Sequence, residues 1–202
     1  MLERAVRASA SWLREDTCRS LAVNLSARNL LDADFPQEVA RVLSRYGVPP
    51  GRLTLEITET TMMSEIDLVG DVLAELRDLG VELSVDDFGT GYSSLALLRQ
   101  VAINEIKADR SFVSRMEESD NDLSIVRATI DLAHSLGLRV VAEGVENAGL
   151  QAILLDLGCD RGQGFHIARP MPIDELRAGS ESGRWPRLPR PRRPDQKMVI
   201  AH

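Results

Sequence analysis

The chain has 202 residues, a hydrophobic fraction of 44%, a charged fraction of 27% and a formal net charge of -7. This composition is typical of a globular domain with a sizeable core, and no apolar stretch approaches the roughly 20 residues of a membrane-spanning helix. Two cysteines are too few for a disulfide framework. The acidic balance disfavours a nucleic acid polymer as partner but is compatible with a phosphate ligand held through metal ions. We therefore expect a cytoplasmic protein without membrane insertion.

The two ends of the chain differ from its centre. Residues 1–15 alternate charged with apolar residues, which predicts an amphipathic helix, and a mitochondrial presequence is the less favoured alternative. Proline and arginine dominate from Arg184 onward, so residues 177–202 are expected to form a basic, disordered tail. A solvated tail without a specific role is preferred to one that binds anionic lipid or nucleic acid.

Between these ends, short runs typical of strands alternate with amphipathic runs of helical length. The predicted strands are, in chain order, residues 21–26, 53–58, 81–87, 104–109, 139–145 and 161–165. The predicted helices, each of which ends in glycine, are residues 35–47, 65–80, 122–137 and 147–158. Glycine is the residue that most often terminates a helix. Repeated units of strand and helix predict an α/β fold with a parallel sheet and right-handed crossovers.

The alternation of side chains within the strands favours a barrel over an open, doubly wound sheet. In residues 53–58, three apolar side chains share one face, and Thr54, Glu56 and Thr58 share the other. A sheet covered by helices on both faces would show continuous apolar runs instead. In an α/β barrel the polar face lines the inside, and the functional groups lie at the carboxyl ends of the strands.

Polar side chains recur near the ends of successive predicted strands. They are Asn24, Glu56, Asp86, Asp87, Lys107, Glu143 and Gln163. Taken singly, each would more often be a cap, a turn residue or a solvated side chain, but their recurrence at one position indicates a shared pocket. Carboxylates gathered in a pocket repel one another, and divalent cations relieve that repulsion. An all-oxygen set suits Mg²⁺ or Mn²⁺, and two such ions suit the hydrolysis of a phosphodiester.

Six motifs resemble, in order, those of the EAL domain family, which are cyclic di-GMP phosphodiesterases of bacterial signalling. The motifs are VNLSARNL, LEITET, SVDDFGTGYSS, IKADRSFV, VVAEGVE and GQGFHIARPMP. The resemblance implies a domain over residues 1–176 with the TIM-like (β/α)8 barrel of the family. It also implies an enzyme that uses two Mg²⁺ or Mn²⁺ ions per site to open cyclic di-GMP to linear pGpG.

The resemblance further implies a role for each candidate residue. The metal ligands would be Asn24, Glu56, Asp86 and Asp87. Lys107 and Glu143 would position or activate the attacking water. Glu59 would brace the loop after Asp87, which in the family links the metal site to a homodimer contact. Glu146 and Gln163 would support the metal-bound water or the substrate, and Phe165 would stack on guanine.

The chain departs from the family pattern because it contains no Glu-Ala-Leu motif, whose glutamate is a metal ligand in the family. By this comparison the chain corresponds to strands 3–8 of an incomplete barrel whose first two strands are missing. Four interpretations follow. The chain is a phosphodiesterase that needs the missing segment supplied, a non-catalytic module that binds cyclic di-GMP or a protein partner, or an inactive gene remnant. An enolase-type barrel with Mg²⁺ and a lysine base explains the chemistry but not the motifs.

Overall fold

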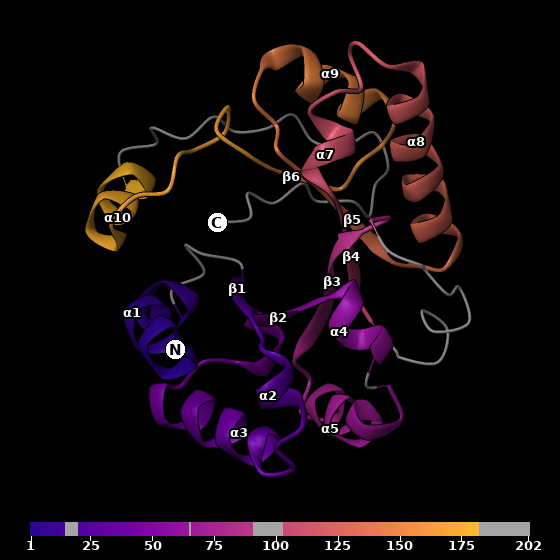
Figure 1. Cartoon of the computed structure of the whole chain (residues 1–202). Coiled ribbons are helices and arrows are strands. Elements are labelled where there is room, and N and C mark those ends of the chain that lie inside the picture. Colours follow the sequence, from indigo (N-terminus) through magenta and orange to yellow (C-terminus); the bar gives the residue numbers. More distant parts are fainter. Residues whose placement is uncertain (15–19, 65, 91–102, 182–202) are drawn as a thin grey trace. The chain divides into compact units, whose positions relative to one another are not determined.

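The computed structural model describes residues 1–14, 20–64, 66–90 and 103–181 (Figure 1). The chain divides into two compact units, an N-terminal unit of Met1–Glu105 and a C-terminal unit of Ile106–His202. Strands and helices alternate along the described parts of both units, as the sequence predicts. None of the helices in the described ranges is both long enough and apolar enough to span a membrane.

The N-terminal unit contains a parallel sheet in the order β1-β2-β3. Its strands are β1 (Leu21–Asn24), β2 (Leu53–Thr58) and β3 (Glu82–Phe88). Its helices are α1 (Leu2–Arg14), α2 (Ala27–Leu30), α3 (Phe35–Tyr46), the 3-10 turn η1 (Pro50–Arg52), α4 (Glu59–Ser64) and α5 (Ile66–Asp78). Both pairs of neighbouring strands run parallel, so each connection carries a helix across one face of the sheet (Figure 1).

The core of the N-terminal unit lies between this sheet and its helices. On β2 the apolar face that the sequence predicts is buried, with Leu55 and Ile57 fully shielded from solvent. Val39, Val42 and Leu43 on α3 are also buried, at the spacing of three and four that places side chains on one face of a helix. Helix α3 ends at Gly47, whose φ of 64° is the left-handed conformation that glycine adopts without a steric penalty.

The C-terminal unit repeats the pattern. Its strands are β4 (Glu105–Ala108), which begins on the last residue of the N-terminal unit, β5 (Arg139–Glu143) and β6 (Arg161–Gln163). Its helices are α7 (Arg110–Val113), α8 (Asp120–Ser135), α9 (Ala148–Asp156) and α10 (Ile173–Glu181). Strands β5 and β6 are parallel. The buried face of α8, which includes Val126 and Ile130, packs with the buried strand β5.

Side-chain caps explain two of the differences between predicted and observed element ends. The first strand stops at Asn24, two residues early, because Ser26 caps α2 and accepts a hydrogen bond from the Asn29 amide. Helix α8 starts at Asp120, two residues early, because Ser119 is its N-cap and accepts from the Asp122 amide. Helix α10 crosses the expected domain boundary at residue 176. The remaining tail, residues 182–202, lies outside the described residues.

Candidate functional site

The carboxyl ends of β1, β2 and β3 carry the polar residues predicted for the N-terminal unit. Asn24 pairs in register with Glu56, and Asp86 pairs with Thr58. Paired residues of parallel strands point to the same side, and side chains two apart on one strand share a face. Asn24, Glu56 and Asp86 therefore lie on one face of the sheet. Glu56 is buried, with 8% of its surface exposed, whereas Asn24 is exposed.

Asp87 has an unusual backbone. The sequence predicts that the strand ends at Asp87, but β3 continues to Phe88, and Asp87 has a φ of 55° within the strand. Among the described residues it is the one non-glycine residue with a positive φ. Aspartate tolerates this conformation better than most residues, and strained backbone often marks functional sites. The Asp87 amide donates to Oδ1 of Asp86 at 3.1 Å, and a carboxylate oxygen of each residue lies within 4.8 Å of the other.

Glu59 lies against the start of the loop that follows β3. It is the first residue of α4, 3% exposed, and its Oε2 accepts a hydrogen bond from the Gly89 amide at 3.1 Å. This hydrogen bond holds the Glu59 carboxylate against the residue that follows β3, and the bracing role stays a prediction. The rest of the loop, residues 91–102, lies outside the described residues. The homodimer contact expected there therefore stays a prediction.

The carboxyl ends of β4, β5 and β6 carry the second predicted set, in the C-terminal unit. The Nζ of Lys107 lies 2.6 Å from Oε1 of Glu143, and the two side chains are only 4% and 17% exposed. Glu143 pairs in register with Gln163 on the neighbouring parallel strand, so their side chains point to the same side of the sheet. A buried lysine needs such a partner, because an unpaired charge away from water is strongly unfavourable. The structure thus brings together Lys107, Glu143 and Gln163.

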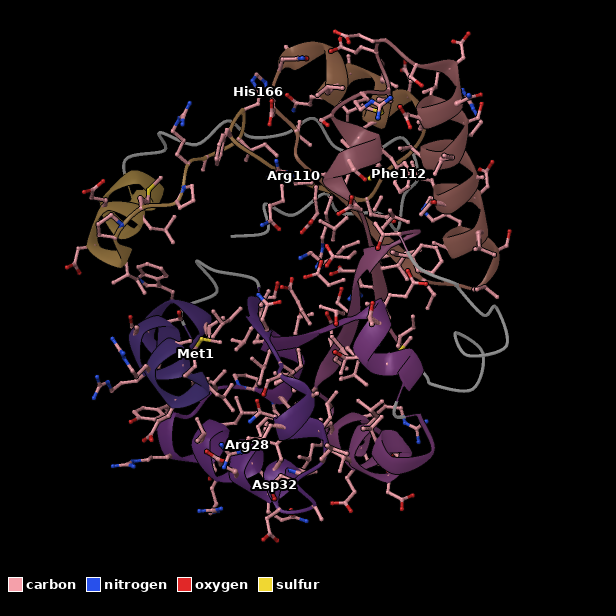
Figure 2. All side chains as sticks on the ribbon, in the orientation of Figure 1. Met1, Arg28, Asp32, Arg110, Phe112 and His166 are labelled. Carbon is pink, nitrogen blue, oxygen red and sulfur yellow. The ribbon has the colours of Figure 1, made fainter. Side chains whose placement is uncertain are left out.

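Two further candidates follow these strands and are exposed. Phe165 is 54% exposed, and the guanidinium carbon of Arg169 lies 4.8 Å from the centre of its ring. The guanidinium of Arg169 thus lies over the exposed ring in a cation–π contact. The neighbouring His166, labelled in Figure 2, has its Nε2 3.1 Å from Oε1 of Gln151. Glu146 is exposed and follows Glu143 by three residues in the sequence.

Sequence reasoning missed two residues that shape this part of the molecule. The contact of Arg169 with Phe165 has no clear sequence signal, because a spacing of four brings side chains together on a helix and this segment is a turn. Gly144 was also missed. It follows Glu143 and has a φ of 73°, and a Cβ placed there would meet Arg110. That contact joins segments from different strands, and no local pattern reveals it.

The donor chemistry of the N-terminal set fits a hard divalent cation. Its side chains offer one carboxamide oxygen and three carboxylates, from Asn24, Glu56, Asp86 and Asp87. Mg²⁺, Mn²⁺ and Ca²⁺ prefer oxygen ligands of this kind, whereas zinc sites usually include histidine or cysteine. The set contains neither.

Comparison with known proteins identifies the family. The family model described as EAL domain matches residues 1–170. The bifunctional diguanylate cyclase/cyclic di-GMP phosphodiesterase MucR of Pseudomonas aeruginosa is 40% identical over 180 residues, which are 83% of this chain and 26% of MucR. More generally, the chain spans about a quarter of the length of the curated relatives it matches.

Solved structures agree with this assignment. The MucR phosphodiesterase in complex with c-di-GMP has a TM-score of 0.82 and 40% identity, and the match covers 87% of this chain and 71% of that one. The EAL domain of Mycobacterium smegmatis DcpA has a TM-score of 0.85 and 38% identity, covering 92% and 84% of the two chains. For the manganese/cy-diGMP complex of Klebsiella pneumoniae BlrP1 the values are 0.77 and 32%, covering 84% and 43%.

These matches confirm the fold class predicted from the sequence, an α/β fold of the TIM-like barrel type. Six strands of this fold lie among the described residues. The family model covers most of the chain, and its relatives include proteins named as cyclic di-GMP phosphodiesterases. The chain belongs to the EAL domain family.

Proposed function

We propose that this chain is a metal-dependent phosphodiesterase that hydrolyses cyclic di-GMP to linear pGpG. The observation that carries the proposal is the buried ion pair between Lys107 and Glu143, at the carboxyl ends of two strands in a member of the EAL family. Charged groups buried in this way at strand ends of α/β barrels are typical of active sites. A nucleotide messenger as substrate also implies that the protein acts in the cytoplasm.

The residues of the N-terminal unit would hold the metal ions. Asn24, Glu56, Asp86 and Asp87 are the proposed ligands of two Mg²⁺ or Mn²⁺ ions, and the manganese complex of BlrP1 supports this choice of metal. When bound, such ions polarise the phosphoryl oxygen and lower the pKa of a water molecule. The oxygen-only donor set and the shared face of Asn24, Glu56 and Asp86 support this assignment.

Glu143 and Lys107 would handle the attacking water. Glu143 accepts a proton from the water as its oxygen forms a bond to phosphorus. The P–O3′ bond breaks, and the leaving oxygen takes a proton from solvent, which gives a 5′-phosphate and a 3′-hydroxyl. Lys107 Nζ donates a hydrogen bond to Glu143, which fixes the direction of the carboxylate and stabilises negative charge as it develops.

The exposed Phe165 and Arg169 would recognise the guanine base. A purine can stack on the open face of the Phe165 ring, and the guanidinium already lies against that ring. Gln163 and Glu146 would contact the substrate or the metal-bound water. Glu59 would connect this chemistry to the loop after Asp87, and through it to a homodimer.

The proposal is tested by measuring pGpG formation from cyclic di-GMP with Mn²⁺, by anion-exchange chromatography, with the MucR phosphodiesterase as positive control. Glu143→Gln keeps the size of the side chain and removes the base, so turnover should fall by about 10²-fold or more. Glu118→Gln, at an exposed carboxylate of the same unit, should leave turnover unchanged. Equal activity of wild type and Glu143→Gln would overturn the assigned role.

A second candidate function is a non-catalytic module that binds cyclic di-GMP. It rests on the exposed Phe165 ring and the Arg169 guanidinium, which could bind a base without any catalytic group. Titration calorimetry separates the two proposals. Binding of cyclic di-GMP without pGpG formation supports the module, whereas binding with Mn²⁺-dependent turnover supports the enzyme. A folded chain that neither binds nor hydrolyses the nucleotide contradicts both.

A further inference from the structure

The segments that follow β4, β5 and β6 approach one another closely at two glycines. A Cβ at Gly144 would stand 2.7 Å from the Cβ of Arg110 and 3.3 Å from its Cα. A Cβ at Gly164 would collide with both the backbone N and O of Val145. Real Cβ atoms do not approach other atoms this closely, so each glycine lets two backbones touch.

The partner of Gly144 is held firmly in place. Arg110 is the first residue of α7, and the preceding Asp109 is the N-cap, whose Oδ1 accepts from the Ser111 amide at 2.9 Å. Asp109 is 9% exposed, and Val113 in the same short helix is fully buried. The backbone at Arg110 therefore cannot move away without disturbing a cap and a core side chain. Figure 2 labels Arg110 at the start of α7.

The segment that contains Gly144 is held from the other side. The Val145 amide donates to the Gln163 carbonyl at 3.0 Å, and the Val145 carbonyl accepts from the His166 amide at 3.0 Å. The Val145 side chain is 1% exposed. Gly144 thus lies between a fixed helix start and a segment that is hydrogen-bonded on both of its backbone groups.

This packing lies directly beside the Lys107–Glu143 ion pair. Glu143 immediately precedes Gly144, and Lys107 lies on the strand that leads into Asp109 and Arg110. We propose that Gly144 and Arg110 form a positioning pair, in which the Cβ of Arg110 against the bare Cα of Gly144 sets the distance from Glu143 to Lys107. The expected effect on turnover depends on the proposed function, but the effect on the ion pair does not.

Two other glycines allow the effect of a steric clash to be separated from the effect of backbone conformation. Gly137 and Gly158 have φ values of 75° and 79°, close to the 73° of Gly144, but a Cβ there would have nothing within 4 Å. Alanine at any of the three positions carries the steric cost of a left-handed backbone. Only alanine at Gly144 also collides with Arg110. Gly158→Ala is therefore the matched control.

The experiment follows the Nζ–H signals of Lys107 by NMR of ¹⁵N-lysine-labelled protein, a readout that needs no activity. Gly144→Ala should shift or broaden the Lys107 signal away from that of the wild type, and Gly158→Ala should not. Arg110→Gly removes the colliding Cβ, so it should restore the signal in the Gly144→Ala background. Arg110→Ala keeps the Cβ and should not restore it. Equal effects of Gly144→Ala and Gly158→Ala, or rescue by both Arg110 variants, would overturn the proposal.

A second comparison decides the matter if Gly144→Ala does not fold. In the otherwise wild-type chain, Arg110→Gly removes the Cβ that packs against Gly144. The Lys107 Nζ protons should therefore exchange faster with solvent in Arg110→Gly than in Arg110→Ala. Ser114→Gly adds similar freedom at the other end of α7 and should leave this exchange unchanged. Equal exchange in Arg110→Gly and Arg110→Ala would refute the positioning role.

Kinetics give a further readout where the wild type turns over cyclic di-GMP. Gly144→Ala should lower kcat by about 10²-fold with little change in KM, because the misplaced group acts on the water and not on the nucleotide. A loss confined to KM would contradict the proposal. If the wild type shows no turnover, the proposed function fails, while the NMR comparisons still decide the positioning role.

Discussion

The Nε2 of His134 lies 2.9 Å from Oδ2 of Asp160, and the same oxygen accepts a hydrogen bond from the Val140 amide at 2.9 Å. Asp160 is 4% exposed. One buried carboxylate therefore joins the last turn of α8, the start of β5 and the residue before β6. These are the amino ends of two strands whose carboxyl ends carry Glu143 and Gln163.

Replacement of Asp160 should destabilise the protein more than replacement of an exposed aspartate. Asp160→Ala leaves the buried Val140 amide without this acceptor, which should lower the free energy of unfolding by about 1–3 kcal/mol. Asp156→Ala, at an exposed position of the same connection, should change it by less than about 0.5 kcal/mol. Urea denaturation measures both. Equal effects would show that the hydrogen bonds of Asp160 contribute nothing specific.

The ion pair of Lys107 and Glu143 should show strong coupling in a double-mutant cycle. Lys107→Met or Glu143→Leu alone leaves a charge in a mostly buried position, which should cost about 3–5 kcal/mol. The double replacement removes both charges and should cost less than the sum of the single changes. Denaturant unfolding of the four proteins gives the coupling energy. Strict additivity would mean that the two groups do not stabilise each other.

Glu59 should protect the amide of Gly89 from hydrogen exchange. Glu59→Ala removes the acceptor at Oε2, so exchange at Gly89 should become faster. Glu59→Gln keeps an oxygen that can accept this hydrogen bond and should retain most of the protection. Thr60→Ala, at the exposed neighbouring position, is the control. The bracing role is wrong if Gly89 exchanges at the same rate in the wild type and in Glu59→Ala.

Cys159 should make the stability of the protein depend on alkaline pH. The pKa of its thiol is raised from 9.0 to about 12, mainly by burial; a hydrogen bond to the Arg161 backbone opposes this rise, and the nearby Asp160 carboxylate adds to it. The unfolded chain therefore loses the thiol proton of Cys159 at a lower pH than the folded protein does. The contribution of this thiol to stability is complete below pH 9 and is lost between pH 9 and pH 12. Urea unfolding of Cys18→Ser should therefore show a steeper decline over this range than Cys18→Ser/Cys159→Ala. Parallel curves would contradict the raised pKa.

The sequence predicted best those strands and helices whose residues follow a strong local pattern. Strand β2 matches its predicted range because its apolar and polar residues alternate without interruption. The same alternation placed Glu56 and Asp86 on the polar face of their strands. The ends of the helices and strands were less predictable, because they depend on capping residues such as Ser26. They also depend on the local backbone, as at Asp87, where the strand continues through a residue in the left-handed conformation.

Contacts between segments distant in the chain were not predictable from local pattern. The sequence placed Lys107 and Glu143 at strand ends, but only the packing of β4 and β5 brings their charged atoms to 2.6 Å. The approach of Arg110 to Gly144 has no local signature at all, since a glycine after a strand usually indicates a turn. The resemblance to a family supplied roles for the candidate residues, and the structure supplied the neighbours through which they can be tested.

The parallel sheet of the N-terminal unit has a consequence for the way the protein folds. Leu21 pairs with Leu53, and Leu55 pairs with Leu83, so each pairing joins residues separated by at least one complete helix. Helices form within about a microsecond, but such distant strands can pair only after a long loop has closed. Refolding should therefore show early helical signal followed by much slower burial of the strand residues. During that interval the edges of β1, β2 and β3 are open to pairing with other chains, which makes dilute protein and low temperature the favourable conditions for recovering the native state.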